Sequence, residues 1–280
     1  MSKTTIFLTF LAIFIVIVNI QGNILSFMPL DDDLAHSFQV EWEDKAFISP
    51  GGRSMSRFFH GDMTVQKSGD HHLLVQFQNV NTDGFKINVA DFQRHPFKLK
   101  VENHSITELV TGENWSVFDV NLKREIMNRF VSDFDNLTRL IDSKNWNEQR
   151  LFELPLGICE ADVKISLLEK EIKIFANAVK SHCNVTEVIK ELPPGFDINR
   201  ALSEDSEGGV RLTVDRVTKK FKELEIMADM ELYLEFKKSR YTVKSRNTFE
   251  YLGSQEAKNV DFGAEFVHNA EKLDSYKKLA

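Results

Sequence analysis

The chain has 280 residues, with 42 acidic against 35 basic side chains and a formal net charge of −7 at pH 7. This acidic balance disfavours nucleic acid and anionic membranes as general partners, because both are negatively charged. Glycine and proline are scarce, at 13 and 6 residues, which argues against disorder over most of the chain. The length allows a substantial buried core, as one large β domain or as two smaller ones.

Residues 1–22 are typical of a secretory signal peptide. Lys3 supplies the basic start, residues 6–20 are nearly unbroken apolar sequence, and Gly22 is small enough for a cleavage site. An uncleaved membrane anchor is the alternative, but the apolar run falls short of the ~20 residues that a spanning helix needs. We therefore expect cleavage and a secreted, extracellular product without a membrane span.

Four Asn-x-Ser/Thr triplets mark candidate glycosylation sites. They are Asn103, Asn114, Asn136 and Asn184. Any single triplet can arise by chance, but four of them behind a signal peptide predict a glycoprotein.

Cys159 and Cys183 are the two cysteines of the chain. A strand hairpin between them would bring them side by side, and an oxidising compartment would favour their pairing. We expect one disulfide, which would stabilise the fold by about 3 kcal/mol in the chain-entropy model.

Alternating apolar and polar residues predict strands in the first part of the chain. The predicted strands are 36–42, 57–66, 73–77, 85–89, 98–101 and 106–110. Turn residues separate several of these runs, as at Pro50-Gly51-Gly52 and Thr82-Asp83-Gly84.

The period changes to that of a helix over residues 121–141. Leu122, Ile126, Phe130 and Phe134 recur every fourth residue and therefore lie on one face. Asp119 lies just upstream, where a carboxylate suits a helix start. The helix should pack this apolar face against a curved sheet.

Strands resume after the helix, over 161–167, 171–179, 221–236 and 241–252. Residues 227–236 could be helical by propensity, but their alternation favours a strand. Pro193-Pro194-Gly195 breaks the pattern, and residues 203–209 are expected to form an acidic, flexible loop. Residues 254–280 form a polar tail with helical character, to which we assign no role.

No catalytic, phosphate-binding or cysteine-cluster motif occurs in the sequence. His71 and His72 are adjacent, so on a strand they would point to opposite faces and could not share one ion. We therefore expect a protein that is not an enzyme and has no cofactor and no metal.

Phenylalanine is frequent, at 23 residues, and allows two interpretations. The rings can form an ordinary half-buried core, or one sheet face can offer them to acyl chains. A basic cluster late in the chain also allows two interpretations. It can form a solvated edge of the sheet, or it can contact a receptor or a lipid headgroup. It comprises Lys237, Lys238, Arg240, Lys244 and Arg246.

The order of several short motifs resembles the amino-terminal sheet of the large lipid transfer proteins, namely vitellogenins, apolipoprotein B and the microsomal triglyceride transfer protein. The motifs are Trp115, Asn-Leu-Lys-Arg at 121–124, Gly157-x-Cys159 and Cys183. Leu122 replaces the usual Ile, Glu125 stands where Gly is usual, and a second cysteine pair is missing.

This resemblance implies a mainly β fold, with an antiparallel barrel-like sheet wrapped around a central helix at 121–135. The domain would span residues 23–253. Full-length relatives continue into a helical superhelix and further sheets that build the lipid cavity, and the chain would end where these begin. We expect a secreted vitellogenin-domain protein of the lipid transport superfamily that binds lipid or a lipoprotein or receptor partner. The alternative is an extracellular interaction protein that retains the barrel without carrying lipid.

Overall fold

The computed structural model describes most of the chain between residues 33 and 273. The described residues are 33–49, 52–68, 72–102, 105–111, 116–142, 150–154, 157–184, 203–218, 220–234, 239–257 and 271–273. The predicted signal peptide and the break at Pro193-Pro194-Gly195 lie outside them.

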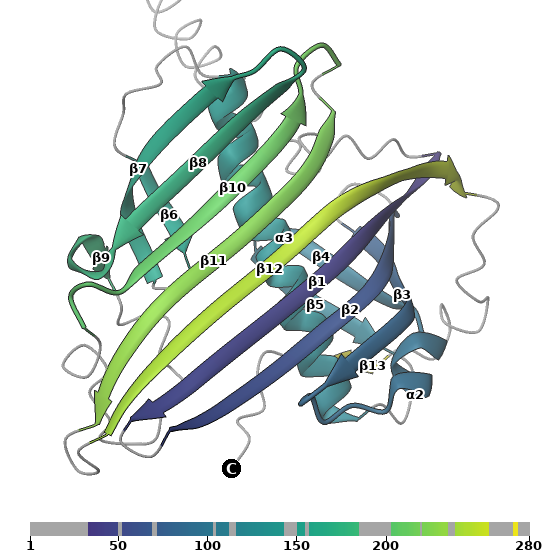
Figure 1. The fold of residues 1–280 in the computed structure, drawn as a ribbon. Helices are drawn as coiled ribbons and strands as arrows, with labels where there is room; N and C mark the ends of the chain where they lie inside the picture. Colours follow the sequence, from purple (N-terminus) through teal and green to yellow (C-terminus); the bar gives the residue numbers. More distant parts are fainter. Residues whose placement is uncertain are drawn as a thin grey trace, which may run out of the picture.

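A single antiparallel sheet dominates the fold (Figure 1). Its strands are β1 (Leu34–Ser49), β2 (Arg53–Lys67), β3 (His72–Asp83), β4 (Phe97–Glu102), β5 (Ser105–Thr111), β6 (Arg150–Leu154), β7 (Gly157–Leu167), β8 (Glu171–Val179), β9 (Cys183–Asn184), β10 (Glu207–Asp215), β11 (Phe221–Leu234), β12 (Ser239–Glu256) and β13 (Glu271–Leu273). They are ordered β13-β5-β4-β3-β2-β1-β12-β11-β10-β8-β7-β6, and β9 pairs with β7.

The sheet is open. Its strand order begins at β13 and ends at β6, and these two strands do not pair in the described part of the chain. The expectation of a mainly β, antiparallel fold is confirmed, whereas the closed form of the expected barrel is not observed.

Two α-helices occur among the described residues, α2 (Val89–Arg94) and α3 (Val117–Asp142), together with the short 3₁₀ turn η2 (Lys180–His182). Figure 1 shows α3 lying behind the long strands, on one face of the sheet. It contacts β5, β6, β10 and β11, which come from both halves of the strand order. Ile126, Met127 and Phe130 on its inner side are at most 1% exposed. The prediction that Ile126 and Phe130 are core residues is therefore confirmed.

The helix begins earlier than the sequence indicated. Ser116 precedes its first turn and accepts hydrogen bonds from the backbone N–H groups of Phe118 and Asp119, at 3.2 and 3.4 Å. A serine hydroxyl in this place satisfies donors that the first helical turn leaves open. Asp119 was expected to serve the helix start, but it is buried within the first turn instead.

The two faces of the sheet follow from the alternation of side chains along each strand. On the inner face, Val40, Phe249, Leu224 and Leu212 are aligned across four neighbouring strands. Each is at most 1% exposed. The outer face carries the charged and polar residues between them.

Three segments differ from the sequence expectations. Residues 85–89 are not a strand: the Asn88 side chain caps α2, accepting from the backbone N–H groups of Ala90 and Asp91. Residues 207–209, expected in a flexible loop, begin β10, which pairs with both β8 and β11. The end of the predicted tail supplies β13, which pairs with β5.

Candidate functional site

The basic cluster that was a candidate for partner binding lies partly on the outer face of β12. Arg240, Lys244 and Arg246 are described, whereas Lys237 and Lys238 lie outside the described residues. Each of the three described cations forms an ion pair with a carboxylate of the neighbouring strand β11. The pairs are Arg240 with Glu231 at 2.6 Å, Lys244 with Asp229 at 2.6 Å and Arg246 with Glu225 at 2.7 Å.

Glu225 is the most deeply buried of these carboxylates, with its side chain 3% exposed. Arg246 approaches it from β12, and Arg211 approaches it from β10 at 2.9 Å. The guanidinium of Arg211 also lies 5.5 Å from the ring centroid of Phe175 on β8. One carboxylate therefore joins three adjacent strands on the outer face.

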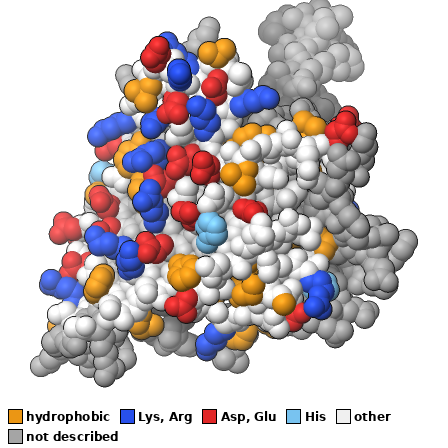
Figure 2. Space-filling model, turned by 45° about the vertical axis from the view of Figure 1, so that its right-hand side comes forward, with side chains coloured by type: hydrophobic (Ala, Val, Ile, Leu, Met, Phe, Trp, Pro, Cys, Tyr) orange, Lys and Arg blue, Asp and Glu red, His pale blue; other side chains and the backbone are white. Residues whose placement is uncertain are grey.

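Figure 2 shows basic and acidic side chains intermixed over this face. The described part of β12 is therefore not an isolated positive patch, because its charges are shared with β11. Opposite charges on neighbouring strands stabilise the sheet by a few tenths to about 1 kcal/mol per pair.

Aromatic side chains fill the inner face. Phe130 of α3 lies 5.0 Å from Phe38 and 5.2 Å from Phe249, measured between ring centroids. These rings are at most 3% exposed. A second group joins β2, β3, β4 and α2. It contains Phe59, Phe77, Phe92 and Phe97, with neighbouring centroids 5.2–6.0 Å apart. For these residues the interpretation as ordinary core is confirmed.

A lysine is buried inside the second aromatic group. The Lys123 side chain of α3 is 0% exposed, and its Nζ donates to the His95 carbonyl oxygen at 3.0 Å. The same Nζ lies 4.7 and 5.2 Å from the ring centroids of Phe92 and Phe97. A cation is attracted to the face of such rings. Asp119, one helical turn earlier and 4% exposed, is the carboxylate whose charge acts on Lys123.

Burial dominates the electrostatics of this pair. It lowers the pKa of Lys123 to about 7, although Asp119 acts in the opposite direction. Burial also raises the pKa of Asp119, against the charge of Lys123 and a hydrogen bond from the Asn88 backbone. Both shifts favour the neutral forms, since removing a charge from water is costly. The amine therefore changes its charge near neutral pH.

The sequence carries a signal for this pair. Asp119 and Lys123 are four residues apart, and Lys123 lies beside Leu122 on the apolar face of the helix. An acidic and a basic residue at this spacing on an otherwise apolar face indicate two buried titratable groups that influence each other.

The predicted disulfide is present. Cys159 on β7 is bonded to Cys183 on β9, and the two residues are register partners. Asn184, the next residue, is exposed and therefore accessible to glycosylation. Asn136 lies within α3, and Asn103 and Asn114 lie outside the described residues.

No group of three or more His, Cys, Asp or Glu side chains among the described residues could hold a metal ion. None of their helices is long and apolar enough to cross a membrane.

No family model and no curated protein sequence matches the chain. A solved structure described by the words "lipid-protein interactions in lipovitellin" matches 81% of this chain, with a TM-score of 0.52 and 11% sequence identity. The fold is vitellogenin-like. The match covers 26% of the lipovitellin chain, so this chain spans about a quarter of that length.

A second structure, a domain of an outer membrane lipoprotein-sorting protein from Vibrio parahaemolyticus, also matches. The match covers 82% of this chain and 89% of that chain, at 10% identity. Its TM-score of 0.26 is too low to support an argument. At 11% sequence identity the likeness to lipovitellin establishes only the fold. For the fold, it confirms the resemblance noted in the sequence.

Proposed function

We propose that this chain is a secreted, glycosylated and non-catalytic vitellogenin-domain protein that binds lipid. The observation that supports the proposal is the vitellogenin-like fold, which extends over 81% of the chain. The description of the matched structure concerns lipid–protein interactions in lipovitellin. A disulfide between Cys159 and Cys183 is compatible with an extracellular location.

The packing of the inner face limits how much lipid the domain would hold. Phe38, Phe130 and Phe249 occupy the space between α3 and the long strands with their own rings. In our proposal the sheet curls around α3, so that this space is filled by side chains rather than by ligand. Bound lipid would then lie in a groove or along an edge, as a few molecules per chain.

Lipid extraction and mass spectrometry of the purified secreted protein test this proposal. We expect one to a few lipid molecules per chain, together with binding of a monomeric fluorescent fatty acid in the absence of vesicles. Dozens of lipids per chain would contradict the limited capacity. If no lipid is extracted and the fatty acid does not bind, lipid binding is refuted.

A protein partner, such as a lipoprotein or its receptor, is the second candidate. The charged outer face favours it, because complementary charges give specificity to protein association. The sharpest test reverses Lys237 and Lys238, since reversing Arg246 would place a carboxylate beside buried Glu225 and destabilise the sheet. Binding of a receptor ectodomain should weaken in Lys237→Glu with Lys238→Glu. Unchanged binding would remove the basic cluster as the contact.

A further inference from the structure

Two turns meet at one end of the sheet, the β7–β8 turn and the β10–β11 turn (Figure 1). We call residues 167–173 and 215–222, apart from residue 219, the paired-turn tip. The backbone N–H of Arg216 donates to the Lys170 carbonyl oxygen at 3.0 Å. Its Nη1 donates to the Leu168 carbonyl oxygen, also at 3.0 Å. These bonds join the two turns into one unit.

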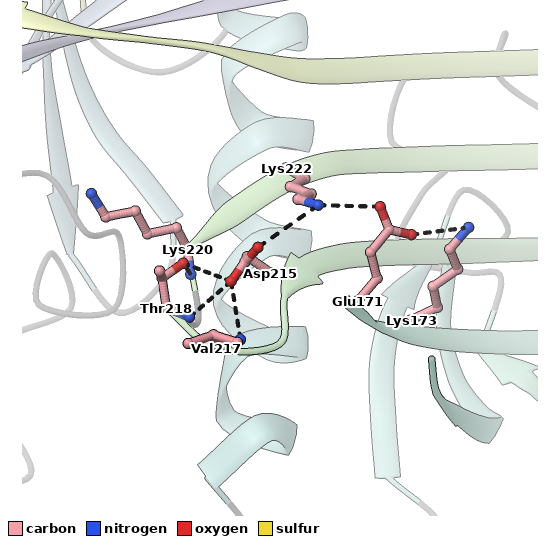
Figure 3. A network of polar contacts seen from close by, with 7 residues as sticks. All are labelled: Glu171, Lys173, Asp215, Val217, Thr218, Lys220 and Lys222. Carbon is pink, nitrogen blue, oxygen red and sulfur yellow. Dashed lines mark hydrogen bonds and ion pairs between the residues drawn. The ribbon is translucent and has the colours of Figure 1, made fainter. Parts of the chain in front are cut away.

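The paired-turn tip exposes three aliphatic side chains. Val217 is 86% exposed, Leu167 is 60% exposed and Leu168 is 45% exposed. Asp215 fixes the β10–β11 turn by accepting hydrogen bonds from the backbone N–H groups of Val217 and Thr218, at 3.0 and 2.8 Å (Figure 3). Val217 is therefore held at a defined turn position while its side chain remains in water.

Cations exceed carboxylates at the paired-turn tip. Its described cations are Lys170, Lys173, Arg216, Lys220 and Lys222, against the carboxylates Glu169, Glu171 and Asp215. Lys222 lies between Glu171 and Asp215, at 3.2 and 3.9 Å, and Lys173 is 3.6 Å from Glu171. In Figure 3 the Lys220 side chain extends away from this network. The tip thus carries positive charge on a chain that is acidic as a whole.

We propose that the paired-turn tip docks onto an anionic lipid surface. Exposed aliphatic side chains surrounded by lysine and arginine are the combination that binds such an interface, through apolar burial and attraction to anionic headgroups. The tip projects at the end of the strands, so it fits a flat, deformable surface. The net charge of the chain does not prevent this contact, because charges beyond ~8 Å are largely screened at physiological ionic strength.

The disulfide end of β7 is compatible with this orientation. Cys159 and exposed Asn184 lie near the start of β7, whereas Leu167 ends it. Leu167 lies eight positions after Cys159 along the strand, which corresponds to about 26 Å. A glycan on Asn184 would therefore remain clear of the lipid surface.

Flotation of the full-length secreted chain with vesicles tests the proposal. The probes are vesicles of phosphatidylcholine alone and of phosphatidylcholine with 30% phosphatidylserine. The wild type should bind the second kind, more weakly at high salt. Leu168→Asp with Val217→Asp should lower the partition coefficient at least tenfold. Lys170→Glu with Lys220→Glu should lower it as much, since each basic residue near such a surface contributes about a fivefold effect.

The matched control changes exposed apolar residues at the opposite end of the long strands. Phe47 and Met55 are 50% and 66% exposed, and Phe47→Asp with Met55→Asp should bind within twofold of wild type. All substituted side chains are exposed, and unchanged melting curves would verify folding. Three results would overturn the proposal. They are a wild type that does not bind anionic vesicles, tip variants that bind as wild type does, and a control that loses as much binding as the tip variants. The fatty-acid assay that tests the proposed lipid binding uses no vesicles. Its result is therefore independent of vesicle binding by the paired-turn tip.

Discussion

Replacing Lys123 by Met should change how the stability of the protein depends on pH. The folded-state pKa of Lys123 is about 7, against an ordinary value of 10.5. Between these values the unfolded chain binds more protons at this site than the folded chain does. Stability should therefore rise as pH increases through this window, and fall as pH decreases toward 7.

The magnitude follows from the size of the shift. Each unit of pKa difference corresponds to about 1.4 kcal/mol. Because Lys123 is already half deprotonated at pH 7, the expected gain for the wild type between pH 7 and pH 9 is about 2 kcal/mol. The side chain is 0% exposed, so solvent screening does not reduce this value. The pKa of neighbouring His95 is lowered from 6.5, so His95 titrates below the window.

Urea unfolding of wild type and Lys123→Met at pH 7, 8 and 9 measures the effect. The difference in their free energies of unfolding should change by about 2 kcal/mol over this range. Lys45→Met replaces an exposed lysine and is the control, and its free energy of unfolding should change with pH as that of the wild type does. Lys123→Met also removes the charge that acts on Asp119, so Lys123→Met with Asp119→Leu serves as the companion variant that lacks both titrating groups. Parallel pH profiles for wild type and Lys123→Met would refute the reasoning.

Three further outcomes follow from the packing and the ion pairs. Phe130→Ala should destabilise the fold by about 3–5 kcal/mol in urea unfolding, against less than 1 kcal/mol for exposed Phe118→Ala. Glu225→Gln should cost about 1–3 kcal/mol, because it removes a buried charge that pairs with two arginines, whereas exposed Glu250→Gln should cost less than 0.5 kcal/mol. Thiol titration of the denatured, non-reduced protein should find no free sulfhydryl, and two free sulfhydryls would contradict the disulfide.

Part of the sheet could be predicted because some of its strands, such as β4 and β8, alternate strictly. β8 agrees with its predicted bounds, and its burial alternates residue by residue. The helix was predictable for a similar reason, since Leu122, Ile126 and Phe130 repeat with the helical period. Pairing between distant strands, such as β1 with β12, depends on contacts between residues far apart in sequence, which local periodicity does not encode.

The sequence predictions were wrong where the local composition was compatible with two different structures. Phe85, Ile87 and Val89 alternate like a strand, but the capping side chain of Asn88 ends the extended segment and starts α2. Glycine at 209 suggested a loop, yet it lies within β10. A Cβ atom there would be 3.0 Å from the Asn177 side chain and 3.2 Å from the Phe175 ring. This glycine therefore reflects close packing on the outer face rather than a turn.

The same ambiguity governs the charged residues. A basic residue can contact a partner, or it can pair with a neighbouring strand, and only the register decides between these roles. Register places Lys244 opposite Asp229, so this cation serves the sheet. Arg216 and Lys220 lie in a turn beyond the paired strands. In the described part of the chain, Arg216 donates only to backbone carbonyl oxygens of the neighbouring turn, and the Lys220 side chain extends away from the ion pairs there. Charges at the ends of strands are therefore better placed for contacts with a lipid surface than the paired charges along β12.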